Sequence, residues 1–153
     1  MGYPIRVKAG ALIIENKTVL LIEYFDENGL HYNLPGGGVE ARESITEAVM
    51  REAKEEASID VSVGPLAFVY DYTPSKNEQK YGPIPSLALY FACQRNQETT
   101  AKLPANPDKN QTAVRWIPLA DLAQVTLFPQ IQQHIIEYAQ HNKKATFLEE
   151  HSL

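Results

Sequence analysis

The sequence predicts one α/β or α+β domain in which helices cover a mixed β-sheet. Short runs that are apolar or alternating, typical of strands, recur along the chain, and two segments have helical features. The length of 153 residues suits one domain with a core of its own. Apolar residues make up 44% and charged residues 22% of the chain, a balance typical of globular rather than disordered proteins.

The expected strands follow from alternation and from the turns that bound them. Residues 5–14 begin in alternation and end apolar, residues 18–24 are apolar and β-branched, and the intervening turn predicts a hairpin over 5–24. A short strand at 31–34 stops at Pro35. Three later strands are expected at residues 59–70 (interrupted at Gly64 and Pro65), 86–94 and 114–117.

Two helices are expected. The first begins at Ser44, which forms a capping-box pattern with Glu47, and ends near residue 57. The second covers residues 128–141 and carries Pro129 near its start. Four apolar residues of this second helix fall on one stripe, namely Phe128, Ile131, Ile135 and Tyr138.

The rest of the chain is expected to form loops, the longest at residues 73–85 and 95–112. The last dozen residues are polar, and we expect them to be loose. This pattern predicts a single domain over residues 1–142 and a polar C-terminal tail over 143–153.

Composition and charge limit the classes of function that the protein can have. The net charge of −5 disfavours a nucleic-acid backbone as the main partner. A small anionic substrate stays compatible with it, because a bound divalent metal reverses the local charge. The single Cys93 cannot form an intramolecular disulfide, the apolar runs are too short to span a membrane, and the N-terminus lacks the features of a signal peptide. We therefore expect a cytoplasmic protein without a membrane partner.

One face of the first helix changes from apolar to acidic along its length. Ile45 and Val49 begin a stripe that Glu52 and Glu56 continue, where packing alone would place apolar side chains. Stacked carboxylates repel each other and oppose the helix dipole, so a compensating cation is indicated. Carboxylate and carbonyl oxygens suit hard ions such as Mg²⁺ or Mn²⁺. Taken alone, such a run is more often a solvated face, but here three glycines at 36–38 precede it and let the backbone approach a ligand.

The stretch from Gly37 to Ile59 resembles the Nudix box, written G-x5-E-x7-R-E-U-x-E-E-x-G-U with U apolar. Eight of the nine specified positions match, and the second glycine is replaced by Ser58, which either takes the left-handed conformation or ends the helix differently. The resemblance implies a Nudix-like, MutT-like α/β/α sandwich around a mixed sheet. It also implies hydrolysis of the pyrophosphate bond in a nucleoside diphosphate linked to another group.

The resemblance assigns roles by position. It implies that Glu52, Glu55, Glu56 and the carbonyl of Gly37 bind the divalent metal, Mg²⁺ or Mn²⁺. It further implies that Arg51 orients the acids and pairs with Glu43, so the expected catalytic residues are Glu43, Arg51, Glu52 and Glu56. The general base is left open between Glu52 and an acid outside the box, namely Glu78, Glu98 or Asp108.

The substrate is open as well. Pro74, fifteen residues past Ile59, resembles a mark of the ADP-ribose pyrophosphatase group and favours ADP-ribose or a related nucleotide sugar. The alternatives are nucleoside triphosphates, dinucleoside polyphosphates, RNA 5′ ends and a Nudix domain that senses a ligand without turnover. Oligomeric state is open too, with a homodimer as one option. Five tyrosines are candidates for base stacking, although core packing is favoured for each: Tyr24, Tyr32, Tyr70, Tyr72 and Tyr81.

Overall fold

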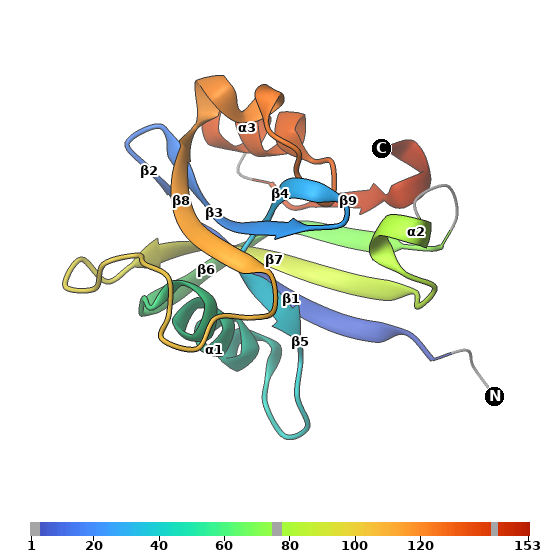
Figure 1. Ribbon diagram of the computed structural model, residues 1–153, viewed down its shortest axis with the longest axis horizontal. Helices are drawn as coiled ribbons and strands as arrows, with labels where there is room; N and C mark the ends of the chain where they lie inside the picture. The colour runs from blue at the N-terminus through green and yellow to red at the C-terminus, as the bar shows by residue number, and fades with distance from the viewer. Residues whose placement is uncertain (1–3, 75–77, 142–143) are drawn as a thin grey trace.

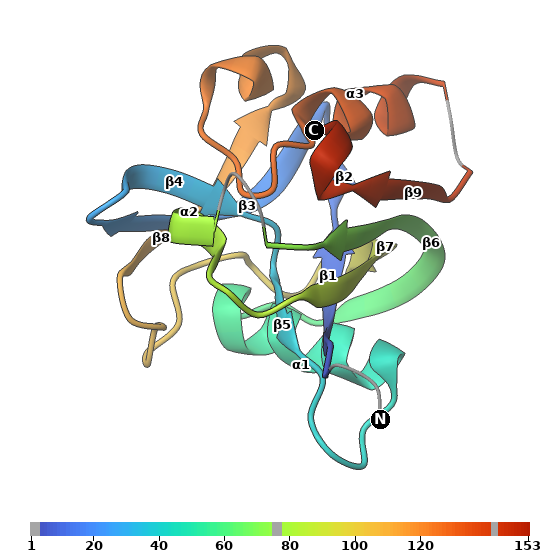
Figure 2. The same ribbon diagram turned by 90° about the vertical axis from the view of Figure 1, so that its right-hand side faces the viewer.

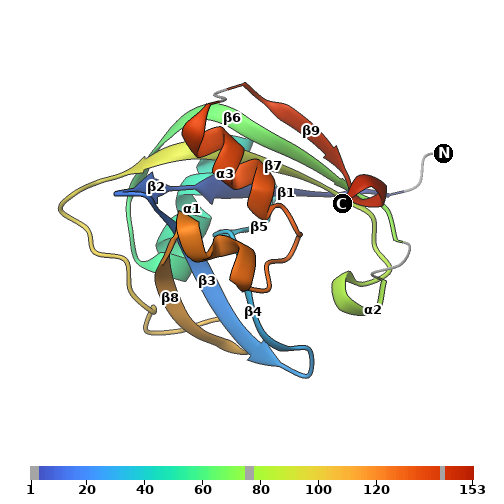
Figure 3. The same cartoon turned by 90° about the horizontal axis from the view of Figure 1, so that it is seen from above.

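The computed structural model describes residues 4–74, 78–141 and 144–153. Two β-sheets lie between helix α1 on one side and helix α3 on the other (Figure 1). Seen from above in Figure 3, α3 lies over the sheets. In chain order the elements are β1 (Arg6–Leu12), β2 (Ile14–Glu15), β3 (Thr18–Asp26), β4 (Gly29–Asn33), β5 (Gly36–Gly38), α1 (Ile45–Ala57), β6 (Val61–Tyr72), α2 (Glu78–Tyr81), β7 (Ser86–Arg95), β8 (Gln111–Pro118), the 3₁₀ helix η1 (Leu119–Gln124), α3 (Gln132–Gln140), β9 (Thr146–Glu149) and the 3₁₀ helix η2 (Glu150–Ser152).

The sheets are mixed, and this confirms the predicted fold class. The first sheet has the order β5-β1-β7-β6-β9, with β1 parallel to β7 and β6 parallel to β9. The second sheet has the order β2-β3-β4, and β8 pairs with the other side of β3. Two buried apolar clusters fill the layers, one beneath α1 and one beneath α3 and η1. The prediction of one mixed sheet is therefore refined to two sheets, both of which contribute residues to each cluster.

The predicted hairpin over residues 5–24 is wrong in its first strand. β1 pairs with β5 and β7, and only the two residues of β2 pair with β3 across the turn at Asn16 and Lys17. That turn itself is present, because both residues have positive φ angles, 50° and 61°. The physical reason is the burial of β1: Ala9, Ala11 and Leu12 are all inaccessible, so this strand suits the middle of a sheet rather than a solvated hairpin.

Helix α1 agrees with its local signals. The Ser44 side chain accepts a hydrogen bond from the Glu47 amide at 3.1 Å, and the Glu47 carboxylate accepts one from the Ser44 amide at 2.8 Å. Such an N-cap contributes about 1 kcal/mol. At the other end Ser58 has φ 63°, so serine takes the left-handed position that glycine occupies in the motif. The helix therefore has the start and the end that the sequence predicts.

The C-terminal region departs from the prediction in two ways. Helix α3 is shorter than expected, although all four residues of the predicted stripe are buried. Residues 146–149 are not loose, because β9 pairs in parallel with Phe68–Asp71 of β6 (Figure 2). Leu148 and Glu150 are buried. The polar composition of this segment gave no sign of a strand. The strand forms because its hydrogen-bond partners lie in β6, far away along the chain. Residue 142, where the sequence places the end of the domain, lies outside the described residues.

Smaller differences concern the loops. Strand β6 runs through Gly64 and Pro65, and its register with β7 shifts between Val63 and Leu66, so the predicted interruption is a bulge. The expected loop at 73–85 contains the single turn α2. No helix in the described part of the chain is long and apolar enough to cross a membrane.

Candidate active site

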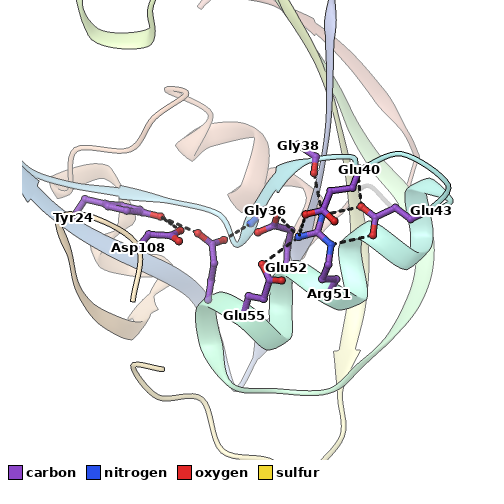
Figure 4. A network of polar contacts seen from close by, with 10 residues as sticks. Tyr24, Gly36, Gly38, Glu40, Glu43, Arg51, Glu52, Glu55 and Asp108 are labelled. Atoms are coloured by element: carbon purple, nitrogen blue, oxygen red, sulfur yellow. Dashed lines mark hydrogen bonds and ion pairs between the residues drawn. The ribbon is translucent and has the colours of Figure 1, made fainter. Parts of the chain in front are cut away.

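Helix α1 and strand β5 bring the glycine segment against the acidic stripe (Figure 4). Glu52 and Glu56 are buried on the inner side of α1, whereas the side chain of Glu55 is 57% exposed. A Cβ on Gly37 would collide with the carboxylate of Glu52. The absence of a side chain at this position therefore lets the carboxylate lie directly against the backbone, as the spacing of the motif suggests.

Arg51 is the centre of an ion-pair network in this cluster. Its guanidinium binds both oxygens of Glu43, with distances of 2.9 Å from Nε and 2.7 Å from Nη2. It also donates to Glu52 at 2.9 Å, to Glu55 at 3.1 Å and to the carbonyl of Gly38 at 3.0 Å. The hydrogen bonds from Arg51 lower the pKa of Glu43 to about 2. The pair Glu43–Arg51 is thus present, and the planar guanidinium fixes the orientation of two further carboxylates.

Glu56 is held by two donors from different parts of the chain. Its Oε1 accepts from the amide of Gly36 at 2.7 Å, and its Oε2 accepts from the hydroxyl of Tyr24 at 2.8 Å. Burial is the main reason that the pKa of Glu56 is raised to about 8, and burial also raises the pKa of Glu52. Two buried carboxylates that resist ionisation would be stabilised in their charged form by a cation.

Asp108 joins this cluster from the loop before β8. Its Oδ2 lies 3.5 Å from the hydroxyl of Tyr24, which also binds Glu56. The other two acids considered outside the box lie elsewhere: Glu78 begins α2, and Glu98 lies in the turn after β7. Sequence reasoning left these three acids equivalent, and only the tertiary structure separates them.

The donor chemistry of the cluster fits a hard divalent cation, since every side chain that could bind one offers carboxylate oxygens. Glu52 and Glu55 instead bind Arg51 here, and Glu56 binds backbone and tyrosine donors. Among the described residues, no group of three or more Asp, Glu, His or Cys side chains is arranged so that it could hold a metal ion. The carboxylate of Glu52 occupies the space beside Gly37 that a side chain would otherwise fill.

A polar pocket adjoins the cluster. Residues of the first sheet line it, including Lys8, Tyr70 and Tyr90, and so do His31 and Asn33 of β4. Tyr24 links the two sites, since its ring stacks on His31 at 5.8 Å while its hydroxyl binds Glu56. The Oδ1 atom of Asn33 is buried, and the described residues provide no donor for it. A buried acceptor of this kind suits a donor from a ligand.

Sequence reasoning missed most of this pocket. The structure places His31 beside the pocket, with its ring stacked on that of Phe128 at a centroid distance of 4.5 Å. Alternation along β4 could have shown that His31 and Asn33 share a face. No local signal could have placed Lys8 beside them. Of the candidate stacking tyrosines, Tyr70, Tyr72 and Tyr81 line the pocket, and Tyr32 lies in the core.

The comparisons with known proteins agree with this site. The NUDIX domain matches residues 4–139, so the chain belongs to the Nudix family. The predicted enzyme class, a Nudix pyrophosphohydrolase, is confirmed at the level of this family. A comparison with curated proteins found no match.

Solved structures support the same assignment. A NUDIX hydrolase from Nitrosomonas europaea has a TM-score of 0.71 at 22% identity, covering 89% of each chain. A MutT NUDIX hydrolase from Burkholderia pseudomallei has a TM-score of 0.69 at 26% identity, covering 88% of this chain and 98% of that one. An ADP-ribose pyrophosphatase from Streptococcus suis has a TM-score of 0.66 at 19% identity, covering 95% and 99%. At these identities the likeness establishes the shared fold.

Proposed function

We propose that the protein hydrolyses the pyrophosphate bond of a nucleoside diphosphate linked to another group, with a divalent metal as cofactor. The observation that carries the proposal is the gathering of Glu52, Glu56 and Asp108 against the glycine segment. Tyr24 joins this cluster to the polar pocket, because its hydroxyl binds Glu56 and its ring stacks on His31. Lys8 lines the same pocket and offers a positive charge to an anionic substrate, despite the net charge of −5.

Glu52, Glu55, Glu56 and the carbonyl of Gly37 are the proposed metal-binding groups, with Mg²⁺ or Mn²⁺ as the metal. When bound, such an ion would neutralise diphosphate charge and lower the pKa of a bound water. The residues of the chain contribute orientation. Arg51 holds the carboxylates of Glu52 and Glu55, and Glu43 holds Arg51 in turn.

A carboxylate must also accept the proton of the attacking water. Glu52 stays a candidate because it lies inside the cluster, next to Gly37. Among the acids outside the box we favour Asp108, because it shares the Tyr24 hydroxyl with Glu56. Glu78 and Glu98 have no contact of this kind with the cluster in the described part of the chain.

We propose ADP-ribose or a related nucleotide sugar as the substrate. Support comes from Pro74 and from the likeness to the Streptococcus suis structure, which is titled an ADP-ribose pyrophosphatase. The likeness to a MutT hydrolase keeps nucleoside triphosphates in the test panel. A homodimer and a cytoplasmic location stay predictions.

The test measures phosphate release from ADP-ribose with Mg²⁺, coupled to a phosphatase, for the wild type and for Glu56→Gln. We expect the variant to lose at least about 10²-fold in turnover, because a charge-stabilising carboxylate is removed. Inactive wild type on ADP-ribose would overturn the substrate but not the reaction, and the panel would extend to nucleoside triphosphates, dinucleoside polyphosphates and capped RNA. No turnover with Mg²⁺ or Mn²⁺ on any of them would favour a ligand-sensing domain.

A further inference from the structure

We propose that Glu150 of η2 is a positioning residue for the substrate pocket, which acts by holding Tyr70 in the pocket wall. The inference rests on the proposed function, because it takes the pocket as the place where the nucleotide binds. Glu150 lies outside the part of the chain that matches the NUDIX domain, residues 4–139. The C-terminal segment would thus add a determinant of substrate affinity to the shared domain.

The contact itself is buried and direct. The hydroxyl of Tyr70 donates to Oε1 of Glu150 at 2.8 Å, and the two residues are 6% and 2% exposed. Burying a carboxylate costs free energy unless hydrogen bonds compensate it. A position used only for packing would favour an apolar side chain, so the carboxylate indicates that an oriented acceptor is needed here.

Strand β9 delivers Glu150 to this place. Its parallel pairing with β6 sets Leu148 opposite Tyr70 and Glu149 opposite Asp71, and η2 then begins at Glu150 (Figure 2). Tyr70 and Tyr72 of β6 line the pocket, so the backbone pairing and the side-chain hydrogen bond both join the C-terminal segment to a strand of the pocket.

Tyr70 begins a continuous row of aromatic contacts that ends at the acidic cluster. The ring of Tyr70 lies 6.5 Å from that of Tyr72, and Tyr24 closes the row with its hydrogen bond to Glu56. Successive ring centroids between these ends are 4.5 to 5.8 Å apart, along Tyr72, Tyr81, Phe128, His31 and Tyr24. Packed rings of this kind transmit a displacement, since protein interiors are close-packed. A shift of Tyr70 would therefore displace the rings nearest to it in the wall, Tyr72 and Tyr81.

The charge of Glu150 also reaches the pocket. After burial, it is the largest cause of the raised pKa of Tyr81, about 12. A change at Glu150 would therefore be felt at Tyr81 as well as at Tyr70.

The experiment compares full-length Glu150→Ala and Glu150→Gln with wild type on the substrate that wild type hydrolyses best. Glu149→Ala is the matched control, since Glu149 is the exposed neighbour at the end of β9. We expect Glu150→Ala to raise KM about tenfold with kcat within about twofold, because an oriented binding wall is lost while the acidic cluster is intact. Glutamine still offers an oxygen to Tyr70, so Glu150→Gln should stay within about threefold of the wild-type KM.

A double-mutant cycle separates positioning from mere stabilisation. Tyr70→Phe should raise KM as Glu150→Ala does, and the double variant should be no worse than either, because both remove the same contact. Additive effects on KM would overturn the proposal. So would a Glu150→Ala protein with a lowered melting temperature but an unchanged KM, which is the result expected of a purely structural residue. If Glu150→Ala does not fold, the KM of Tyr70→Phe, which lacks the hydrogen bond, is compared with that of Glu150→Gln, which keeps an acceptor for it.

A failure of the proposed hydrolase function can be distinguished from a failure of the role inferred for Glu150. If wild type hydrolyses nothing in the panel, AMP binding is measured by calorimetry for wild type, Glu150→Ala and Glu149→Ala. Weaker binding by Glu150→Ala alone would support the positioning role without hydrolysis. Equal binding by all three, or no binding of AMP, would overturn it.

Discussion

The hydroxyl of Tyr24 donates a hydrogen bond to Oε2 of Glu56 at 2.8 Å, although the two residues are 32 positions apart. The same tyrosine ring stacks on His31 in the pocket wall. One side chain therefore contacts both the carboxylate cluster and the pocket, and it orients the most deeply buried acid of α1.

Tyr24→Phe removes this donor while keeping the ring. We expect kcat to fall by about tenfold with little change in KM, because Glu56 loses an orienting hydrogen bond and the stacking is retained. Tyr32→Phe is the control, since its hydroxyl donates to the carboxylate of Glu23, outside the cluster, at 2.8 Å. Equal losses in steady-state kinetics for the two variants would contradict the prediction.

Asp108→Asn tests the proposed acid outside the box. If Asp108 accepts the proton of the attacking water, kcat should fall by about 10² to 10⁴-fold. Glu98→Gln should remain near wild-type activity, because Glu98 lies in the turn after β7. Equal activity of both variants would leave Glu52 as the base.

Arg51→Lys keeps the positive charge but loses the planar fork that binds Glu43, Glu52 and Glu55. We expect kcat to fall at least about tenfold, since a lysine cannot form the bidentate contact. Arg95→Lys is the matched control. Arg95 of β7 makes a similar bidentate pair with Glu15 of β2, and both of its distances are 2.9 Å. Comparable losses of kcat in both variants would show that the bidentate geometry at Arg51 has no specific role in catalysis.

The stability of the metal-free protein should fall as pH rises from about 4.5 to 8. Burial raises the pKa of Glu56 from 4.5 to about 8, so in this window the folded state keeps a proton that the unfolded state has lost. Stability is then fully present below the unfolded pKa and is lost at a rate of roughly 1.4 kcal/mol per pH unit. Urea unfolding across this range measures the slope.

Two controls test whether the ionisation of Glu56 causes this pH dependence of stability. Glu56→Gln cannot ionise, so its unfolding free energy should depend less steeply on pH. Saturating Mg²⁺ should raise the stability of wild type most at the alkaline end, because the ion favours the charged carboxylates. A wild-type slope equal to that of Glu56→Gln would show that Glu56 ionises freely in the fold.

The first helix shows how much local sequence can determine. The capping box of Ser44 and Glu47, the αL end at Ser58 and the acidic stripe depend on contacts within one or two turns, so periodicity and capping rules reach them. The pairing of Glu43 with Arg51 spans eight residues and follows from the same motif.

The partners of that helix were decided by the tertiary structure. The pairing that places β1 between β5 and β7, the position of Asp108 beside Tyr24 and the burial of Glu150 against Tyr70 join residues that are far apart in the chain. A strand pattern states which face is apolar but not which strand will pair with it, because the hydrogen bonds of a sheet come from non-local neighbours. The sequence by itself therefore determined the acidic helix and its family, whereas the pocket, its aromatic wall and the C-terminal strand depend on long-range packing.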